Sequence, residues 1–153
     1  LGIAAWDLIM WSNTMRLIVG LFMQLFLSLT CFAHTFSVYV SFSMPKQLLI
    51  ETLQESVQLN IPVYLNGLHQ DSMAKTVRKI MSLSQSVPNL NLQIDPTAFE
   101  RYAITSVPAL VVDNGHVFDV IYGNLSLKKG LERIVDQGVS GLSLEQLRGH
   151  YER

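Results

Sequence analysis

Cysteine is nearly absent from this chain of 153 residues. The single cysteine, Cys31, lies in an apolar stretch near the N-terminus, and residues 34–153 contain none. A disulfide needs two thiols, so a domain built from residues 34–153 must be held together by its hydrophobic core. The same absence excludes thiol–disulfide exchange by that domain alone, because the thiolate is the reacting group.

Charge is also scarce. Asp, Glu, Lys and Arg make up 15% of the residues, and the formal net charge is −1. The basic residues form no cluster in the sequence, which argues against nucleic acid or an anionic membrane surface as the main partner. The sequence also lacks a phosphate-binding loop, a nucleophile motif and paired carboxylates. The histidines, at positions 34, 69, 116 and 150, lack the close spacing of a metal site. We therefore expect a protein that is not an enzyme and holds no cofactor or metal.

The hydrophobic residues are concentrated near the N-terminus. Arg16 precedes an apolar run from residue 17 to residue 30, and the small residues Cys31 and Ala33 follow it. One positive charge, a run of this length and small residues before a cleavage point are typical of a secretory signal peptide. An uncleaved membrane anchor is the alternative, although the run is short and contains Gln24 and Ser28. We predict that residues 1–33 are an extension plus signal peptide, cleaved after Ala33, and that the chain meets the membrane only through this segment before cleavage.

From residue 34 onward, strand patterns alternate with helix patterns. The predicted strands lie at 35–42, 61–65, 91–94, 109–112 and 117–122, and the last two form a hairpin. The predicted helices begin at Ser43, at Asp71 or Ser72, at Asp95 and at Ser126, each of which can cap a helix. In the second helix we expect a buried side made of Met73, Val77, Ile80, Met81 and Leu83.

The order of these elements predicts an α/β fold. Strands that alternate with helices favour a parallel first half, and the hairpin adds an antiparallel second half, so we expect a mixed β-sheet flanked by helices. The predicted domain spans 34–138 and ends at Gly138. A C-terminal tail follows at 139–153, in which Ser143 and Gln146 suggest a short helix through a capping box.

One motif leads to a first resemblance. Thr105-Ser106-Val107-Pro108-Ala109 runs into the apolar strand that begins at Leu110. In this respect the chain resembles thioredoxin-like proteins, in which such a proline is cis and faces a Cys-x-x-Cys loop after the first strand. The corresponding loop here is Ser41-Phe42-Ser43-Met44-Pro45, without cysteine. The resemblance implies a thioredoxin-like mixed sheet with a cis-proline before the fourth strand, and a redox fold without redox chemistry.

Longer stretches of sequence extend the resemblance. The matching residues include Val40 to Pro45, Asn66-Gly67-Leu68, Ile94-Asp95-Pro96, Phe99, Tyr102, Val107-Pro108-Ala109, Tyr122 to Leu127 and Leu131. Over residues 36 to 135 the chain resembles the F-type conjugative transfer pilin-assembly proteins of the TrbC type. Two positions depart from that family's pattern: Asn66 stands where an arginine is frequent, and Asn124 stands where an acid is common.

The resemblance implies a function as well as a fold. It implies a non-catalytic periplasmic assembly factor for a conjugative pilus and its type IV secretion system, which acts through contacts with other periplasmic assembly proteins of the TraW type. Two alternatives remain at this point: a general periplasmic peptide-binding chaperone, and a relative of thiol-disulfide oxidoreductases. The missing cysteines weigh against the second.

The loop and the proline together predict a protein-binding site. An extended peptide can pair with an unpaired strand edge beside such a proline, while side pockets select its side chains. The residues expected to line this groove are Ser41, Ser43, Met44, Pro45, Ser106, Val107 and Pro108. The competing interpretation is structural, with Ser43 capping a helix, Met44 packed in the core and Pro108 fixing a turn.

Overall fold

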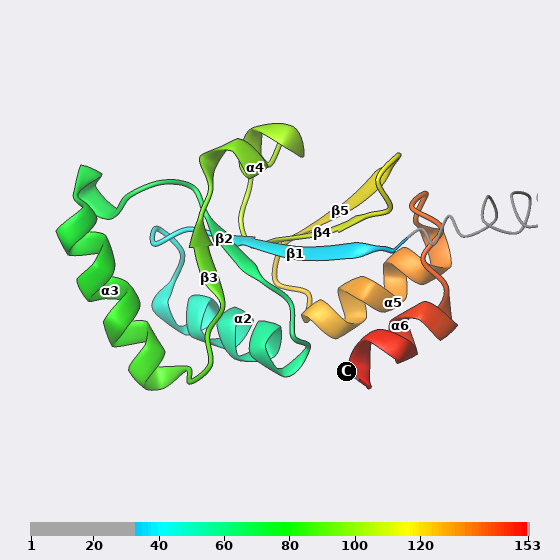
Figure 1. Cartoon of the computed structure of the whole chain (residues 1–153), viewed down its shortest axis with the longest axis horizontal. Helices are drawn as coiled ribbons and strands as arrows, with labels where there is room; N and C mark the ends of the chain where they lie inside the picture. The colour runs from blue at the N-terminus through cyan, green and yellow to red at the C-terminus, as the bar shows by residue number, and fades with distance from the viewer. Residues whose placement is uncertain (1–32, 153) are drawn as a thin grey trace, which may run out of the picture. The chain divides into compact units, whose positions relative to one another are not determined.

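The computed structural model describes residues 33–152, and the predicted extension and signal peptide lie outside them except for Ala33. Five strands form one sheet in the order β3-β2-β1-β4-β5 (Figure 1). In chain order, the elements are β1 (Thr35–Val40), α2 (Lys46–Gln58), β2 (Val63–Leu65), the 3₁₀ turn η1 (His69–Asp71), α3 (Met73–Ser86), β3 (Leu92–Ile94), α4 (Pro96–Arg101), β4 (Ala109–Asp113), β5 (Phe118–Tyr122), α5 (Leu127–Gln137) and α6 (Leu144–Tyr151).

The sheet is mixed, as the sequence predicts. β1, β2 and β3 run parallel to one another, and α2 and α3 supply the long crossovers that parallel neighbours need. β4 pairs antiparallel with β1, and β5 pairs antiparallel with β4 through a short hairpin. Three parallel strands followed by an antiparallel hairpin, with helices on both faces, confirm the thioredoxin-like arrangement expected from the sequence.

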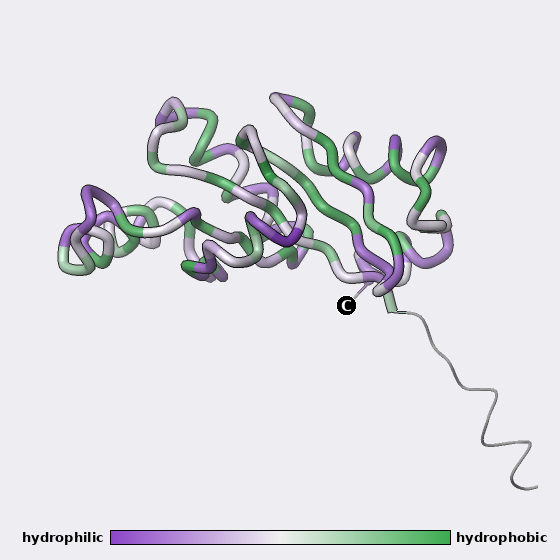
Figure 2. The backbone as a smooth tube through the Cα atoms, turned by 90° about the horizontal axis from the view of Figure 1, so that it is seen from above, coloured by the Kyte–Doolittle hydropathy of each residue, from purple (hydrophilic) through white to green (hydrophobic). Residues whose placement is uncertain are grey.

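The main core lies between one face of the sheet and four helices. Val38 and Val40 of β1 point to this face, and they pack with apolar residues of α2, α3, α5 and α6. Tyr39 lies between them in sequence and points to the other face, where it packs with Ala98 and Phe99 of α4. Alternation of side chains along a strand accounts for this division. Figure 1 shows α4 on one side of the sheet and α2, α5 and α6 on the other. Figure 2 shows hydrophobic residues along the central strands.

Helix α3 differs from its prediction. Its buried residues are Thr76 and Leu83, and Ile80 is half-buried. Met73, Val77 and Met81 are exposed, so their assignment to the buried side is wrong. Ser72 caps α3 as predicted, because its hydroxyl accepts a hydrogen bond from the Lys75 N–H at 3.4 Å.

The C-terminal segment is part of the domain. The predicted short helix is present as α6, with the Ser143–Gln146 capping box in place. Leu142 and Leu147, however, are 4% and 3% exposed and belong to the main core. A domain boundary after Gly138 is therefore wrong, because removing residues 139–153 would uncover part of that core.

None of the helices within residues 33–152 is long and apolar enough to cross a bilayer.

Candidate functional site

Three loops meet at one end of the sheet. Antiparallel pairing places Tyr39 opposite Ala109, so the segment that follows β1 lies beside the segment that precedes β4. Parallel pairing places Val40 next to Leu65, so the loop after β2 lies at the same end. The Val107–Pro108 peptide bond at this end is cis. The topology therefore gathers the loops that begin at Ser41 and Asn66 and the segment that ends at Pro108.

The first two loops enclose a pocket of about 280 Å³, which we call the β1–β2 pocket. It is lined by Ser41, Phe42, Ser43, Leu65, Asn66, Gly67, Leu68, His69 and Gln70. The volume is large enough for one or two side chains of a bound polypeptide and lies at the lower end of the range of small-molecule sites, roughly 300–1,000 Å³. The lining mixes apolar surface with uncharged polar groups.

The two serines of the β1–β2 pocket hydrogen-bond to each other. Their Oγ atoms lie 2.9 Å apart, and the Ser43 N–H donates to Ser41 Oγ at 3.2 Å. The His69 ring packs edge-on against Phe42, with ring centroids 5.3 Å apart. Because the serine hydroxyls are engaged with each other and His69 contacts a hydrocarbon ring, these residues form no serine–histidine pair of the kind that activates a nucleophile.

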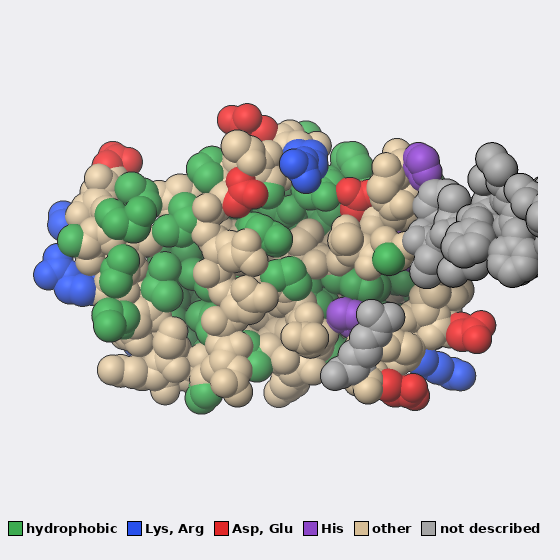
Figure 3. All heavy atoms as spheres, viewed as in Figure 1, with side chains coloured by type: hydrophobic (Ala, Val, Ile, Leu, Met, Phe, Trp, Pro, Cys, Tyr) green, Lys and Arg blue, Asp and Glu red, His purple; other side chains and the backbone are tan. Residues whose placement is uncertain are grey.

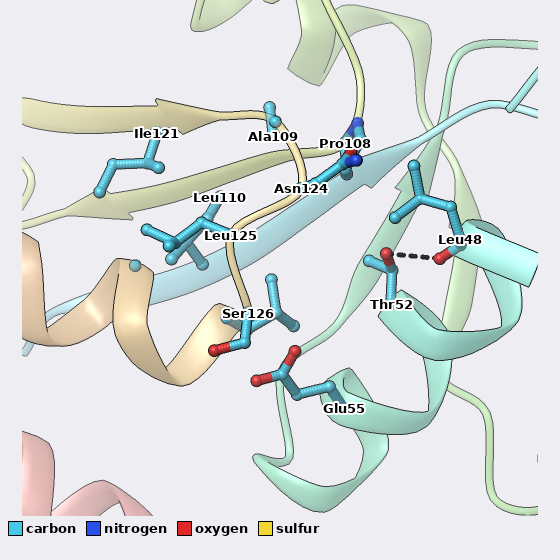
Figure 4. Close-up of a pocket in the computed structure, with 13 residues that line it drawn as sticks. Leu48, Thr52, Glu55, Pro108, Ala109, Leu110, Ile121, Asn124, Leu125 and Ser126 are labelled. Carbon is cyan, nitrogen blue, oxygen red and sulfur yellow. Dashed lines mark hydrogen bonds between the residues drawn. The ribbon is translucent and has the colours of Figure 1, made fainter.

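Pro108 lies at a second, much smaller depression (Figure 4). Leu48, Thr52 and Glu55 of α2 line one side, and residues 123–127 line the other. Its volume of about 20 Å³ is enough for roughly one water molecule. The surroundings are tied together by hydrogen bonds, because Thr52 Oγ1 donates to the Leu48 carbonyl at 2.8 Å and the Lys128 N–H donates to Glu55 Oε1 at 3.0 Å. This depression cannot admit a side chain as it stands.

The seven predicted site residues have different surroundings. Ser43, Pro45 and Ser106 are exposed, and Ser41 and Val107 are half-buried. Met44 is 8% exposed and belongs to the main core, and Pro108 is also buried. For Met44 the structure therefore agrees with the competing interpretation, packing in the core, and a buried side chain offers little surface to a partner. Ser43 does not cap α2, whose first turn begins after Pro45 without a side-chain cap.

Sequence reasoning missed one wall of the β1–β2 pocket. It treated Asn66-Gly67-Leu68 as a turn and assigned no role to His69 or Gln70. Gln70 and Asp71 both have left-handed backbone angles, with φ of 52° and 50°. Such angles cost non-glycine residues about 1–3 kcal/mol each and concentrate at functional sites. The Asn-Gly pair signals a turn, but nothing in the sequence indicates the two strained residues after it.

A further cavity lies at the opposite end of β1, near His34 and Thr35. Its volume is about 490 Å³, and it contains none of the predicted site residues. Burial raises the pKa of Tyr39 on its wall to about 12, so this phenol is neutral at physiological pH. A hydrogen bond from the Thr97 hydroxyl lowers the pKa of Asp95, which caps α4 through the N–H groups of Thr97 and Ala98. Asp95 is thus occupied as a helix cap.

The part of the chain that the structure describes contains no candidate metal site. No group of three or more His, Asp or Glu side chains is close enough there to hold an ion. The arrangement at the loop end of the sheet offers neutral hydrogen bonds and apolar contacts, which are the means of binding another polypeptide.

Comparison with known families establishes what kind of protein this is. The sequence model for "Type-F conjugative transfer system pilin assembly protein" matches residues 38–134. The chain belongs to this family. The match starts within β1 and ends within α5, so it contains the second half of β1, all of β2 to β5 and both loops of the β1–β2 pocket. The TrbC-type resemblance found in the sequence is thereby confirmed.

A curated relative supports the assignment. The chain is 37% identical over 100 residues to periplasmic protein TrbC of Escherichia coli (strain K12), a match that covers 65% of the chain and 47% of the relative. The chain thus spans about half the length of this relative.

Solved structures of low identity share parts of the architecture. StoA from Bacillus subtilis is 10% identical with a TM-score of 0.46, covering 64% of this chain and 79% of StoA. A putative thiol:disulfide interchange protein DsbE from Chlorobium tepidum is 12% identical with the same TM-score, covering 78% of this chain and 81% of its own. At this level of similarity neither comparison bears on function.

Proposed function

We propose that this chain is a non-catalytic periplasmic assembly factor for an F-type conjugative pilus and its type IV secretion system, acting through protein–protein contacts. The observation that carries the proposal is the family match over residues 38–134. Periplasmic location is supported by the name of the Escherichia coli relative, periplasmic protein TrbC, and by the signal-peptide pattern of residues 15–33.

The residues support binding rather than catalysis. Residues 34–153 contain no cysteine, so the chain cannot cycle between a dithiol and a disulfide. Ser41 and Ser43 hydrogen-bond to each other, and within residues 33–152 neither hydroxyl is hydrogen-bonded to a histidine or carboxylate that could activate it. We expect the domain to show no activity in an insulin-reduction assay.

The loop end of the sheet is the proposed contact site. Ser41, Ser43 and Ser106 present hydroxyl groups there, and Pro45 presents an apolar ring. Leu68, which is 39% exposed, lines the β1–β2 pocket together with Ser41 and Ser43. A partner segment can place an apolar side chain against Leu68 and Phe42 and satisfy the serine and asparagine groups by hydrogen bonds. TraW-type assembly proteins are the partners proposed for this contact.

Co-purification tests the proposal. The tagged chain is expressed in donor cells that carry the complete transfer system, and periplasmic proteins that co-purify with it are identified by mass spectrometry. We expect pilus-assembly proteins to be recovered, and Leu68→Asp to reduce their recovery by at least about tenfold, because a carboxylate on the pocket wall would be desolvated without a partner.

The matched control is Leu144→Asp on α6, whose side chain is 55% exposed and lies outside the β1–β2 pocket. This variant should recover the same proteins as the wild type. Equal recovery by both variants would move the contact elsewhere while keeping the function. Recovery of many unrelated polypeptides would favour the general chaperone, and recovery of none would contradict the assembly role.

A further inference from the structure

Helix α3 presents an apolar stripe to solvent. Met73, Val77 and Met81 follow one another at intervals of four residues and are 57%, 44% and 63% exposed. Four-residue spacing places them on one side of the helix. That side adjoins the one that carries the buried residues Thr76 and Leu83. The apolar surface of α3 therefore continues beyond the part that the domain covers. Figure 3 shows hydrophobic side chains gathered at the α3 end of the domain.

The remaining side of α3 is cationic. Lys75, Arg78 and Lys79 line a shallow groove of about 350 Å³ together with His69, Gln70 and Ser82. Lys75 Nζ donates to Gln70 Oε1 at 2.9 Å. Among residues 33–152, the side chains of Arg78 and Lys79 have no hydrogen-bond or ion-pair partner. α3 contains no Asp or Glu that could neutralise these charges.

Helix α5 differs from α3 in its distribution of charge. It also carries three basic residues, Lys128, Lys129 and Arg133, but Glu132 and Asp136 are interspersed with them. The whole chain has a formal net charge of −1, so α3 is a locally positive surface on a nearly neutral protein. The three cations lie within residues 75–79 of the sequence, and the helix brings their side chains to one side.

We propose that α3 is a docking surface for an acidic, amphipathic segment of a partner protein. The apolar side chains of that segment cover Met73, Val77 and Met81, and its carboxylates lie against Arg78 and Lys79. The inference rests on the proposed function, since the partner is another protein of the same transfer system. α3 would be a second contact surface, distinct from the loop end of the sheet, and the segment bound there would be acidic and amphipathic.

A protein partner fits this surface better than a lipid headgroup region. Lipid-binding clusters usually contain roughly four to eight basic residues, and α3 has three. The stripe also lacks the Trp, Phe and Leu side chains that anchor interfacial helices. Methionine is flexible and polarizable, and exposed methionines are typical of surfaces that adapt to a partner's side chains.

Site-specific photo-cross-linking in donor cells tests the inference. The photoreactive amino acid benzoylphenylalanine replaces Val77 in the full chain, and the cross-linked peptide is identified by mass spectrometry. We expect an adduct with an acidic, apolar-containing segment of another transfer protein. In the same background, the triple change Lys75→Glu, Arg78→Glu and Lys79→Glu should reduce its yield by at least about tenfold, because the attraction of Arg78 and Lys79 for the partner's carboxylates becomes repulsion and the change at Lys75 adds to it.

Two matched controls accompany the experiment. Benzoylphenylalanine at Leu144 on α6 measures the background of an exposed position. The triple change Lys128→Glu, Lys129→Glu and Arg133→Glu on α5 reverses the same number of charges and should leave the Val77 adduct unchanged. Urea unfolding of each variant establishes that it is folded.

Several outcomes would overturn the inference: no Val77 adduct above the Leu144 background, an adduct with lipid or with a second copy of the chain, or a yield unaffected by charge reversal on α3. If wild-type co-purification still recovers pilus-assembly proteins in that case, the assembly function stands and only the α3 surface is wrong. If the wild type recovers none, the proposed function itself fails.

Discussion

Replacing Leu131 with alanine is expected to lower the free energy of unfolding by about 2–5 kcal/mol. Leu131 lies on α5, is 0% exposed and belongs to the main core with Leu110 and Val112 of β4. Truncation removes buried methyl groups and leaves a cavity that the close packing of α5 on β4 prevents from collapsing. Gly130 is evidence of that close packing, because an added Cβ there would lie 2.9 Å from Leu110 Cδ2.

Urea denaturation of the domain with and without the change measures this effect. Leu144→Ala is the control, because Leu144 is 55% exposed on α6 and its truncation should change the free energy by no more than about 0.5 kcal/mol. Similar values for the two variants would contradict the assignment of α5 to the core. The free energy of unfolding of a native domain is only about 5–15 kcal/mol, so a loss of this size at Leu131 would also lower the amount of folded, functional protein.

The second large effect is expected at Asp119 on β5, which ties the C-terminal segment to the sheet. Its carboxylate oxygens accept hydrogen bonds from the N–H groups of Val139 and Ser140, each at 2.8 Å. The Ser140 carbonyl in turn accepts from Asn114 Nδ2 at 2.7 Å and lies 2.9 Å from His34 Nε2. Asp119→Ala leaves two N–H groups without their acceptor, and we expect a loss of about 1–3 kcal/mol.

The effect of Asp119→Ala should depend on pH. Burial raises the pKa of this carboxyl, but hydrogen bonds from Ser140 and Val139 outweigh burial and bring it below its ordinary value of 3.8. A lowered pKa in the folded state means that the contribution to stability is complete above about pH 4 and disappears as the pH falls through the folded value. The difference between wild type and variant should therefore be constant near neutral pH and shrink in acid.

Asp136→Ala is the matched control, because Asp136 is exposed on α5 and accepts no such pair of backbone hydrogen bonds. Its unfolding free energy should stay within about 0.5 kcal/mol of the wild type at every pH tested. A difference for Asp119→Ala that persists unchanged to pH 2 would show that the carboxylate charge is not what holds residues 139 and 140.

Local patterns were enough to predict the order and type of the elements. Period-two alternation marked β1, Asn114-Gly115 marked the turn between β4 and β5, and Asp95 marked the start of α4 as its cap. These patterns predict secondary structure because helix capping, turn formation and the alternation of side chains along a strand depend on residues only a few positions apart. The absence of cysteine after residue 33 likewise excluded thiol–disulfide exchange by residues 34–153 alone, without any structure.

Burial was not predictable in the same way. The periodicity of α3 showed that one side of the helix is apolar, and Met73, Val77 and Met81 were assigned to the core for that reason. The structure leaves them exposed, because the domain covers only the side of the helix that carries Thr76 and Leu83. Conversely, the predicted tail proved to be part of the core through Leu142 and Leu147.

The candidate site shows the same limit. The sequence pointed to Ser41 to Pro45 and Ser106 to Pro108 and left open whether Met44 packs in the core, which is where the structure places it. It did not indicate that Asn66 to Gln70 form the opposite wall of the β1–β2 pocket. Which loops meet is decided by strand order and register, which join residues far apart in the chain. Local sequence patterns set the secondary structure and excluded thiol chemistry, whereas only long-range pairing and packing decided which side chains face a partner.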